Sequence, residues 1–289
     1  MTDIRQSRQY ADYLSQIGWI VERINNTNYF IKRLLLIGSV LKIQRPENID
    51  FEEIERLRKK YRVFQIIIEP KNKSQTQRIL NNGYKQSKSP YLPTKTLHLD
   101  LSISKQKLFT NLKKDAIYAI KRTINIQINI IKDAELFRKS WKKVVGYQRY
   151  VPPLSHLISL KKSFGDNAFF ISSGLPAEDS AEAGAIFLLC GKTAFGEASS
   201  SAFGEASSSA YYWQAFTGKR ARKSQIQYGI VWRGILWAKK KGAKIFDFEG
   251  IYDSRFPNKS WLGFTHFKKS FGGNVVEYPG CYTKWNLLP

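Results

Sequence analysis

Two carboxylates alternate along a short apolar stretch near the end of the sequence. Asp247 and Glu249 lie in KIFDFEGI (244–251), which is typical of a strand that ends in glycine, so both side chains are expected on one face. Paired carboxylates can divide the roles of general acid and general base. They could equally form ion pairs with neighbouring lysines, and the sequence leaves both roles open.

A lysine between aromatic residues follows this stretch. Lys268 comes directly after Phe267 and shortly before Phe271. A cation held there could stabilise the oxyanion that develops during acyl transfer. Composition alone favours an ordinary surface lysine at this position.

A basic loop, TGKRARKS (217–224), lies upstream. It contains four cations within five residues: Lys219, Arg220, Arg222 and Lys223. They stand just before a helix predicted to begin near 225, whose N-terminus offers unpaired N–H groups and a partial positive charge. Cations this close repel one another unless an anion screens them, which favours a phosphate contact. A solvated run of charge is the alternative.

The sequence contains no motif for covalent or metal chemistry. It has no glycine-rich phosphate loop of the nucleotide-hydrolase type and no GxSxG motif. Its two cysteines, Cys190 and Cys281, lack Cys or His neighbours at metal-ligand spacing. We therefore expect neither a metal site nor a covalent nucleophile. Direct attack by a bound amine on an activated ester would need only positioning and charge stabilisation.

The charge balance narrows the class of partner. Lys and Arg number 47 against 23 for Asp and Glu, which gives a formal net charge of +24 at pH 7. A charge of this size raises the local concentration of polyanions and speeds their capture. Nucleic acid, an anionic membrane face and phosphorylated substrates are all compatible with it. A solubilising surface, or the Lys, Ile and Asn bias of an AT-rich genome, is the plainer explanation.

Strands and helices alternate along the chain and must position these groups. This alternation favours a mixed α/β fold, and 289 residues allow one large domain or two ordinary ones. Strands are predicted at 18–24, 30–43, 63–70, 96–102, 124–131, 185–191, 210–216 and 244–251. Helices are predicted at 5–18, 51–60, 74–83, 104–123, 133–146 and 225–241.

No segment has the character of a membrane span or a signal peptide. The longest early apolar run, LLLIGSV (34–40), has strand length and is too short to cross a bilayer. The first residues have no apolar core region. We therefore expect a cytoplasmic protein without a transmembrane segment, although its basic residues leave a peripheral contact with the inner membrane face open.

A short tandem repeat interrupts the pattern. AFGEASSS occurs at 194–201 and again at 202–209. The stretch is rich in Ser and Ala, which is typical of a flexible loop or hairpin tip, placed here at about 192–209. We assign it no chemistry.

The C-terminal block resembles the signature of the FemABX family, whose pattern is roughly YDFxGI, a proline, GxxxFKxxFGG and a V-x-Y strand. The corresponding segments are FDFEGI (246–251), Pro257, GFTHFKKSFGG (263–273) and VVEY (275–278). KTLHLDLS (95–102) and QSRQYADYLSQIGW (6–19) are similar to the family's TLxLDLS element and its opening. The resemblance covers most of the chain apart from 174–210.

The resemblance implies a fold class and a domain division. The family fold is α/β (α+β), with two tandem GCN-related acetyltransferase (GNAT)-like domains whose mixed sheets are flanked by helices. The absence of a long paired-helix insertion implies the compact, armless layout. The expected domains are 1–130, completed by a C-terminal strand in 275–289, and 131–274.

The resemblance also implies an activity. Family members are bacterial tRNA-dependent aminoacyltransferases that add an amino acid to the stem peptide of a peptidoglycan precursor. Aminoacyl-tRNA would be the co-substrate, with no other cofactor and no metal. The acceptor would be a side-chain amine on a UDP- or lipid-linked muropeptide. Both substrates are polyanionic, which suits the net charge.

The resemblance assigns roles to four residues. Lys268 matches the family lysine thought to stabilise the transferring carbonyl, and Phe267 stands beside it. Tyr212 and Arg149 are candidates for the acceptor site. The chain departs from the pattern at four positions, which bear on the identity of the acceptor: Tyr10, Ser15, Ile117 and Ala119.

Two alternatives come from other functional classes. The chain could be an acyl-CoA-dependent N-acyltransferase of the GNAT fold, which the missing glycine-rich pyrophosphate loop disfavours. It could also be a non-catalytic RNA-binding protein, which the FKKSFGG match (267–273) disfavours.

Overall fold

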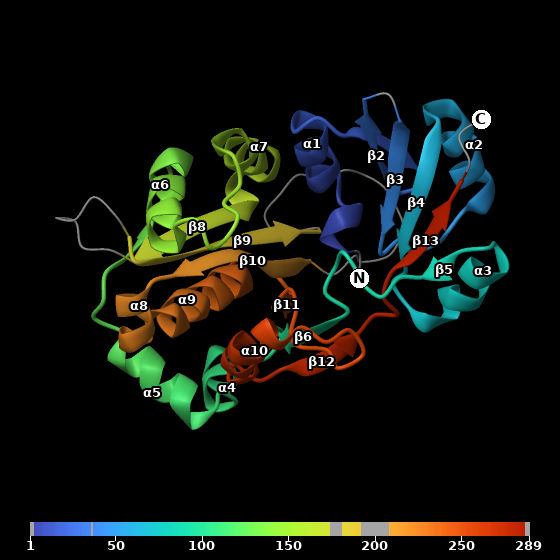
Figure 1. The fold of residues 1–289 in the computed structure, drawn as a ribbon. Helices are drawn as coiled ribbons and strands as arrows, with labels where there is room; N and C mark the ends of the chain where they lie inside the picture. The colour runs from blue at the N-terminus through green and yellow to red at the C-terminus, as the bar shows by residue number, and fades with distance from the viewer. Residues whose placement is uncertain (1–2, 36, 174–180, 192–207, 287–289) are drawn as a thin grey trace.

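Two mixed β-sheets lie side by side in the computed structural model, which describes residues 3–35, 37–173, 181–191 and 208–286 (Figure 1). In the described chain, the first sheet has the strand order β1-β2-β3-β4-β13-β5. Its strands are β1 (Ile20–Ile24), β2 (Thr27–Leu34), β3 (Gly38–Gln44), β4 (Val63–Glu69), β13 (Tyr282–Trp285) and β5 (Lys85–Gln86).

The second sheet has the order β12-β6-β11-β10-β9-β8-β7 in the same described ranges. Its strands are β12 (Asn274–Glu277), β6 (Lys95–Asp100), β11 (Ile245–Asp247), β10 (Ser209–Thr217), β9 (Ala183–Cys190), β8 (Ala168–Ser173) and β7 (Ile128–Ile130). The pairs β3–β4 and β10–β11 are parallel, and the other pairs are antiparallel.

Helices flank both sheets (Figure 1). The α-helices are α1 (Arg8–Gln16), α2 (Phe51–Tyr61), α3 (Thr76–Asn81), α4 (Lys105–Thr110), α5 (Lys114–Arg122), α6 (Ala134–Val145), α7 (Leu154–Phe164), α8 (Lys219–Ser224), α9 (Ile226–Lys240) and α10 (Leu262–Lys269). Four 3₁₀ turns accompany them in the described ranges: η1 (Ile4–Gln6), η2 (Lys73–Gln75), η3 (Gly165–Asn167) and η4 (Lys259–Trp261). None of these described helices is long and apolar enough to cross a bilayer.

Strand β9 lies inside the second sheet, between β10 and β8, and is buried at every position. Successive side chains of a strand point to opposite faces. Phe187 and Leu189 therefore join a cluster with α9 and α5, whereas Ile186 and Leu188 join one with α6 and α7. The two helical layers lie on opposite faces of the sheet (Figure 1).

The second of these clusters also crosses into the N-terminal half. Ile4, Tyr10 and Leu14 pack in it together with Phe30 of β2. Helix α1 lies against α7, and Ser7 caps it by accepting a hydrogen bond from the Tyr10 N–H at 3.1 Å. This cluster is therefore shared by the two halves, whereas the other face of the first sheet packs a separate cluster with α2 and α3, which includes Ile31 and Leu57.

The expected mixed α/β pattern is confirmed, as is the hairpin that flanks the repeat. Strands β9 and β10 are antiparallel: Ala183 pairs with Thr217 at one end and Cys190 pairs with Ser209 at the other. Most of the repeat loop predicted at 192–209, residues 192–207, lies outside the described residues.

Two long predicted elements are each divided in the structure. The strand expected at 30–43 is a hairpin of β2 and β3, because the chain turns back after Leu34 and Gly38 takes a φ of +95°. The helix expected at 104–123 is α4 and α5, and the Lys113 N–H between them donates to the Ser270 carbonyl. Tertiary pairing overrides the continuous apolar pattern in both.

The domain boundary expected at 130 does not coincide with the division between the sheets. Strand β6 and helices α4 and α5 pack with the second half, because β6 pairs with β11 and β12. The C-terminal segment is shared: β12 stays with the second sheet, and only β13 of the described strands returns to pair with β4 and β5.

Helix α9 approaches β9 at a glycine. A Cβ on Gly234 would stand 2.3 Å from the Phe187 ring, whereas Gly263 of α10 has nothing within 4 Å. We expect Gly234→Ala to lower the free energy of unfolding by about 1–3 kcal/mol through overpacking. Gly263→Ala is the matched control and should be neutral or stabilising, because alanine is the better helix former. Urea denaturation measures both, and equal midpoints would contradict the packing assignment.

Candidate active site

The parallel strands β10 and β11 diverge at the middle of the second sheet. Among the described residues, their pairing begins with Ser209 opposite Ile245 and ends with Tyr211 opposite Asp247. Strand β10 then continues to Thr217. The segment that follows β11 bends away from it at Glu249 and Gly250, which have φ angles of +52° and +106°. The divergence leaves backbone carbonyls of the bent segment without ladder partners, and a side chain takes their place.

Lys268 fills this wedge. Its Nζ donates to the Phe248 carbonyl at 2.6 Å and to the Gly250 carbonyl at 2.7 Å, and it lies 5.6 Å from the centre of the Tyr212 ring. The Phe264 ring covers it at 4.9 Å. The residue is only 8% exposed, so it is not the surface lysine that composition alone favours. An ammonium has three donors, which leaves one beyond the two carbonyls.

Burial sets the protonation of this ammonium. Desolvation lowers the pKa of Lys268 to about 8, against the opposing attraction of Glu249 and Asp247. The group is therefore largely charged at neutral pH and loses its proton in mildly alkaline solution. A cation in a site from which water is excluded interacts strongly with a developing negative charge.

Phe267 and Tyr212 support this wedge from two sides. Phe267 packs edge-on against Tyr228 of α9 and against Phe271. Tyr212 accepts a hydrogen bond from Gln227 Nε2 at 2.7 Å, and burial raises its pKa. Both aromatic residues pack with the core cluster of the second half, and the Tyr212 ring lies beside the Lys268 ammonium.

Asp247 and Glu249 do not share a face, contrary to the expectation for one continuous strand. β11 ends at Asp247, so the alternation does not reach Glu249. Asp247 is buried against β6, where it accepts from Thr96 Oγ1 at 2.6 Å and lies 3.1 Å from His98 Nε2. Burial alone would raise the pKa of Asp247, but His98 and Thr96 hold it well below its usual range.

Glu249 faces the N-terminal segment instead. It forms a two-pronged ion pair with Arg5, with contacts of 2.7 and 3.2 Å. Arg5 also pairs with Asp3 at 3.1 Å, and Asp3 pairs with Arg45 at 2.9 Å. All four charged side chains are buried. Removal of any one of them would leave a partner buried without its opposite charge, which is strongly unfavourable.

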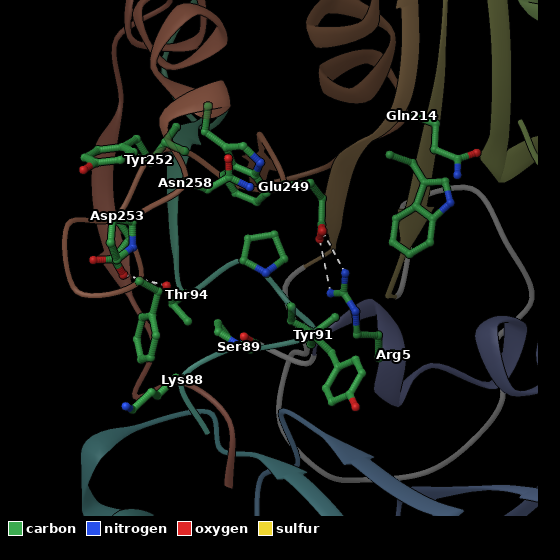
Figure 2. Close-up of a pocket in the computed structure, with 18 residues that line it drawn as sticks. Arg5, Lys88, Ser89, Tyr91, Thr94, Gln214, Glu249, Tyr252, Asp253 and Asn258 are labelled. Atoms are coloured by element: carbon green, nitrogen blue, oxygen red, sulfur yellow. Dashed lines mark hydrogen bonds and ion pairs between the residues drawn. The ribbon is translucent and has the colours of Figure 1, made fainter. Parts of the chain in front are cut away.

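A cleft of about 570 Å³ opens beside this ion pair (Figure 2). The loop 88–94, the β10 residues Trp213 and Gln214, and the segment 249–261 form its walls. A β-bulge between Tyr212 and Gln214 shifts the register of β10 and turns Trp213 toward the cleft. Its other aromatic residues are Tyr91, Tyr252, Phe256 and Trp261, and its charged residues are Arg5, Lys88, Glu249 and Asp253.

A second hollow of about 250 Å³ continues the groove on the far side of Arg5 and Trp213. It is lined by residues of the first half, including Trp19 and Lys42. The Lys42 Nζ lies 4.4 Å from the Tyr91 ring centre, and burial lowers its pKa. The Nε of Arg5, between the two hollows, is buried without a hydrogen-bond partner in the described chain.

Lys268 is not in the wall of this cleft, as far as the described residues define it. The backbone of residues 248–251 separates them: its carbonyls bind Lys268, while the Glu249 carboxylate and Ile251 face the cleft. Lys268 thus lies one layer of backbone behind the cleft, at the β10–β11 wedge.

The cationic residues proposed from the sequence lie at the surface near the C-terminal end of β10. Lys219, Arg220, Arg222 and Lys223 are exposed on α8, a short helix rather than the predicted loop. Arg149 is exposed as well, and it donates to the Ala215 carbonyl of β10 at 3.5 Å. It also lies close enough to Tyr212 to act on its hydroxyl electrostatically. Helix α8 and Arg149 therefore both lie near the strand that carries Tyr212.

The structure adds residues that sequence reasoning missed. Arg5, Trp213 and Asp253 line the cleft, and Asp253 accepts from Thr94 Oγ1 at 2.6 Å. Arg5 stood at the first position of the helix predicted at 5–18, and Trp213 lay in the strand predicted at 210–216, so neither residue gave a signal of its own. In the described part of the chain, no three His, Cys, Asp or Glu side chains are grouped to hold a metal ion.

No family model matches this sequence, and no curated protein matches it. Solved structures nevertheless share the fold. FemX superposes with a TM-score of 0.75 at 12% identity, covering 98% of this chain and 92% of that chain. L-PGS from Bacillus licheniformis gives 0.57 at 10%, covering 94% and 85%. A tandem GNAT protein from the clavulanic acid biosynthesis pathway gives 0.53 at 8%, covering 98% and 96%.

These similarities confirm the predicted fold class and, at the level of the fold, the resemblance to the FemABX family. The chain is built from two tandem GNAT-like units with mixed sheets flanked by helices.

The buried position of Asp247 gives a pH-dependent prediction. Because its pKa is depressed, its ionised form stabilises the fold above about pH 4, and this stabilisation is lost as the pH falls toward 2. Asp247→Asn should lower the free energy of unfolding at pH 7 by roughly 2 kcal/mol. The difference from the parent protein should shrink as the pH falls. Asp12→Asn, at an exposed position, is the control, and a pH-independent difference at 247 would refute the assignment.

Proposed function

We propose that this protein transfers an amino acid from aminoacyl-tRNA to an amine of the stem peptide of a peptidoglycan precursor. The observation that carries the proposal is the position of Lys268. It is a buried cation fixed at the wedge between β10 and β11, in a fold shared with FemX along 98% of the chain.

Lys268 would act on the reacting carbonyl. When the amine nitrogen attacks the ester carbon, the carbonyl oxygen becomes an oxyanion; the ester C–O bond then breaks, and the proton lost by the amine goes to the departing ribose oxygen. The remaining N–H donor of Lys268 would stabilise that oxyanion, and a single donor of this kind contributes roughly 3 kcal/mol. The backbone carbonyls hold the ammonium in place beforehand, so it need not reorganise during the reaction.

The two-part groove suits a peptide acceptor. Its aromatic side chains can cover apolar parts of an extended chain, and its carboxylates can attract an amine. Glu249 is the charged group that faces the groove while its own backbone neighbours bind Lys268. We propose that the acceptor peptide lies in the groove and that its amine-bearing side chain reaches past Glu249 and the edge of the 248–251 segment to the ester at the wedge.

The cations of α8 and Arg149 would contact phosphates of the donor or of the nucleotide- or lipid-linked acceptor. Helix α8 follows β10, which carries Tyr212 into the wedge, and Arg149 contacts β10 at the Ala215 carbonyl. A net charge of +24 would favour the encounter with such polyanions. The proposal requires aminoacyl-tRNA as co-substrate, no further cofactor, and a location in the bacterial cytoplasm where both substrates are found.

Incubation of the protein with charged tRNA and a UDP-linked or lipid-linked muropeptide tests the function. A mass increase of the muropeptide by one or more aminoacyl residues is the expected result. Acetyl-CoA consumption without tRNA would instead support an acyl-CoA-dependent N-acyltransferase. Salt-sensitive RNA binding without any product would support a non-catalytic RNA-binding protein.

Substitution of the lysine tests the mechanism. Lys268→Met should reduce turnover by about 10²- to 10³-fold, because it removes one oxyanion donor. The parent protein should lose activity as the pH rises through about 8, where Lys268 loses its proton, and the variant should lack this alkaline limb. Lys269→Met, the exposed neighbour on α10, is the matched control. A parent rate that rises through pH 8 in step with Lys268 deprotonation would mean that the lysine acts as a base.

Charge removal on α8 tests the phosphate contact. Arg222→Ala with Lys223→Ala should raise the KM for the polyanionic substrate. It should also reduce the slope of log KM against log salt by about one for each phosphate that the protein no longer neutralises. Lys73→Ala with Lys85→Ala removes the same charge from exposed positions of the first half and should leave the slope unchanged. Equal effects of the two pairs would show a general field rather than a site.

A further inference from the structure

The turn between β2 and β3 exposes aliphatic side chains. Leu35 is 95% exposed, Ile37 52% and Leu34 38%; Leu36, which lies between them in sequence, is outside the described residues. Tight turns favour Gly, Asn, Asp and Ser, which tolerate both water and unusual backbone angles. Exposure of three aliphatic side chains at one turn is therefore costly in water, and it indicates a surface that is covered in use.

An exposed tryptophan lies toward the same end of the first sheet, on a strand that β4 separates from β3. The turn lies at one end of the first sheet, where Ser39 pairs with both Arg33 and Val63. The next paired residues along these strands are Val40 and Gln65, and Gln65 pairs with Trp285 of β13, whose side chain is 67% exposed. The β2–β3 turn, the end of α2 and the C-terminal strand lie along the same edge of the molecule (Figure 1).

Cations surround the apolar side chains. Arg33 adjoins the turn, and Lys59 and Arg62 lie at the end of α2, where the Arg62 carbonyl accepts from the Ser39 N–H. All three are exposed. The nearby carboxylates are paired: Glu22 with Lys60 at 2.7 Å, and Glu55 with Arg58 at 2.7 Å. The end of the sheet is therefore apolar at its tip and cationic around it.

We propose that this end of the first sheet docks on an anionic lipid bilayer. We name it the hairpin-tip surface: Leu34, Leu35 and Ile37 at the tip, with Trp285, Arg33, Lys59 and Arg62 around it. The aliphatic tip enters the boundary between head groups and acyl chains, the tryptophan lies at the head-group level, and the cations bind lipid phosphates.

The shape of the surface favours a bilayer over a protein partner. A stable protein interface buries about 800 Å² on each side and is built around a well-packed core. A protruding turn with three described aliphatic side chains offers no comparable area. A bilayer accepts such a protrusion without a complementary pocket, and the combination of apolar insertion with phosphate attraction is what reversible peripheral binding requires.

The surface differs from other exposed apolar residues of the chain. Tyr118 and Ile124 are also exposed, but they stand singly on and after α5, and isolated apolar side chains are normal on protein surfaces. They supply the matched control. The docking proposal does not depend on the transfer reaction, so the two proposals can be refuted independently.

Sedimentation with vesicles tests the docking. The full chain should bind vesicles of phosphatidylcholine with about 30 mol% phosphatidylglycerol, and bind pure phosphatidylcholine at least about tenfold more weakly. Leu35→Ser with Ile37→Ser should reduce binding to the anionic vesicles by at least about tenfold. Tyr118→Ser with Ile124→Ser should leave it unchanged. Undiminished binding of the Leu35/Ile37 variant would overturn the proposal.

A label at the tip tests insertion itself. Both native cysteines are buried, so Leu35→Cys gives a single accessible thiol for an environment-sensitive fluorophore. Its emission should shift to the blue on addition of anionic vesicles, whereas a label at Tyr118→Cys should not respond. A shift that follows protein concentration without lipid, together with a dimer in analytical ultracentrifugation, would identify a second copy of the chain as the occupant and refute the bilayer.

Discussion

A buried ion-pair network joins the two halves of this protein, and the geometry of the candidate site depends on it. Arg5 of the N-terminal segment binds Glu249, which follows β11 of the second sheet, while Asp3 binds Arg45 at the end of β3. Arg45 also stacks on Tyr278 at 3.6 Å and donates to the Pro93 carbonyl. Buried charges persist only in such pairs, because each would otherwise lose its hydration without compensation. The network therefore holds Glu249 to one side of the chain.

The position of Glu249 determines what Lys268 can do. With the carboxylate bound to Arg5, the flanking carbonyls of Phe248 and Gly250 turn to the opposite side and accept from Lys268. A bent segment of backbone thus separates a carboxylate that faces the cleft from a cation that fills the β10–β11 wedge. The cation is desolvated and already oriented, which is the condition under which a charged donor acts most strongly on a reacting group.

The fold alone does not specify this chemistry. It is shared with FemX, with L-PGS and with a tandem GNAT protein, whose names refer to different processes. A common scaffold of diverging parallel strands can serve several transfer reactions, and the residues placed at the wedge and in the cleft distinguish them. In this chain those residues are a buried lysine, an aromatic groove and an exposed basic helix.

Local periodicity and an ordered motif were enough to predict the alternation of strands and helices, the hairpin around the repeat, and the segment that contains Lys268. They could not predict the partners of Lys268, which are backbone carbonyls exposed by a bend, or the pairing of Arg5 with Glu249, which are 244 positions apart. They assigned Leu35 to a strand, although the chain turns there and exposes it. Burial, ion pairing and exposure depend on which distant segments meet, and the packing of the two sheets against each other settles that.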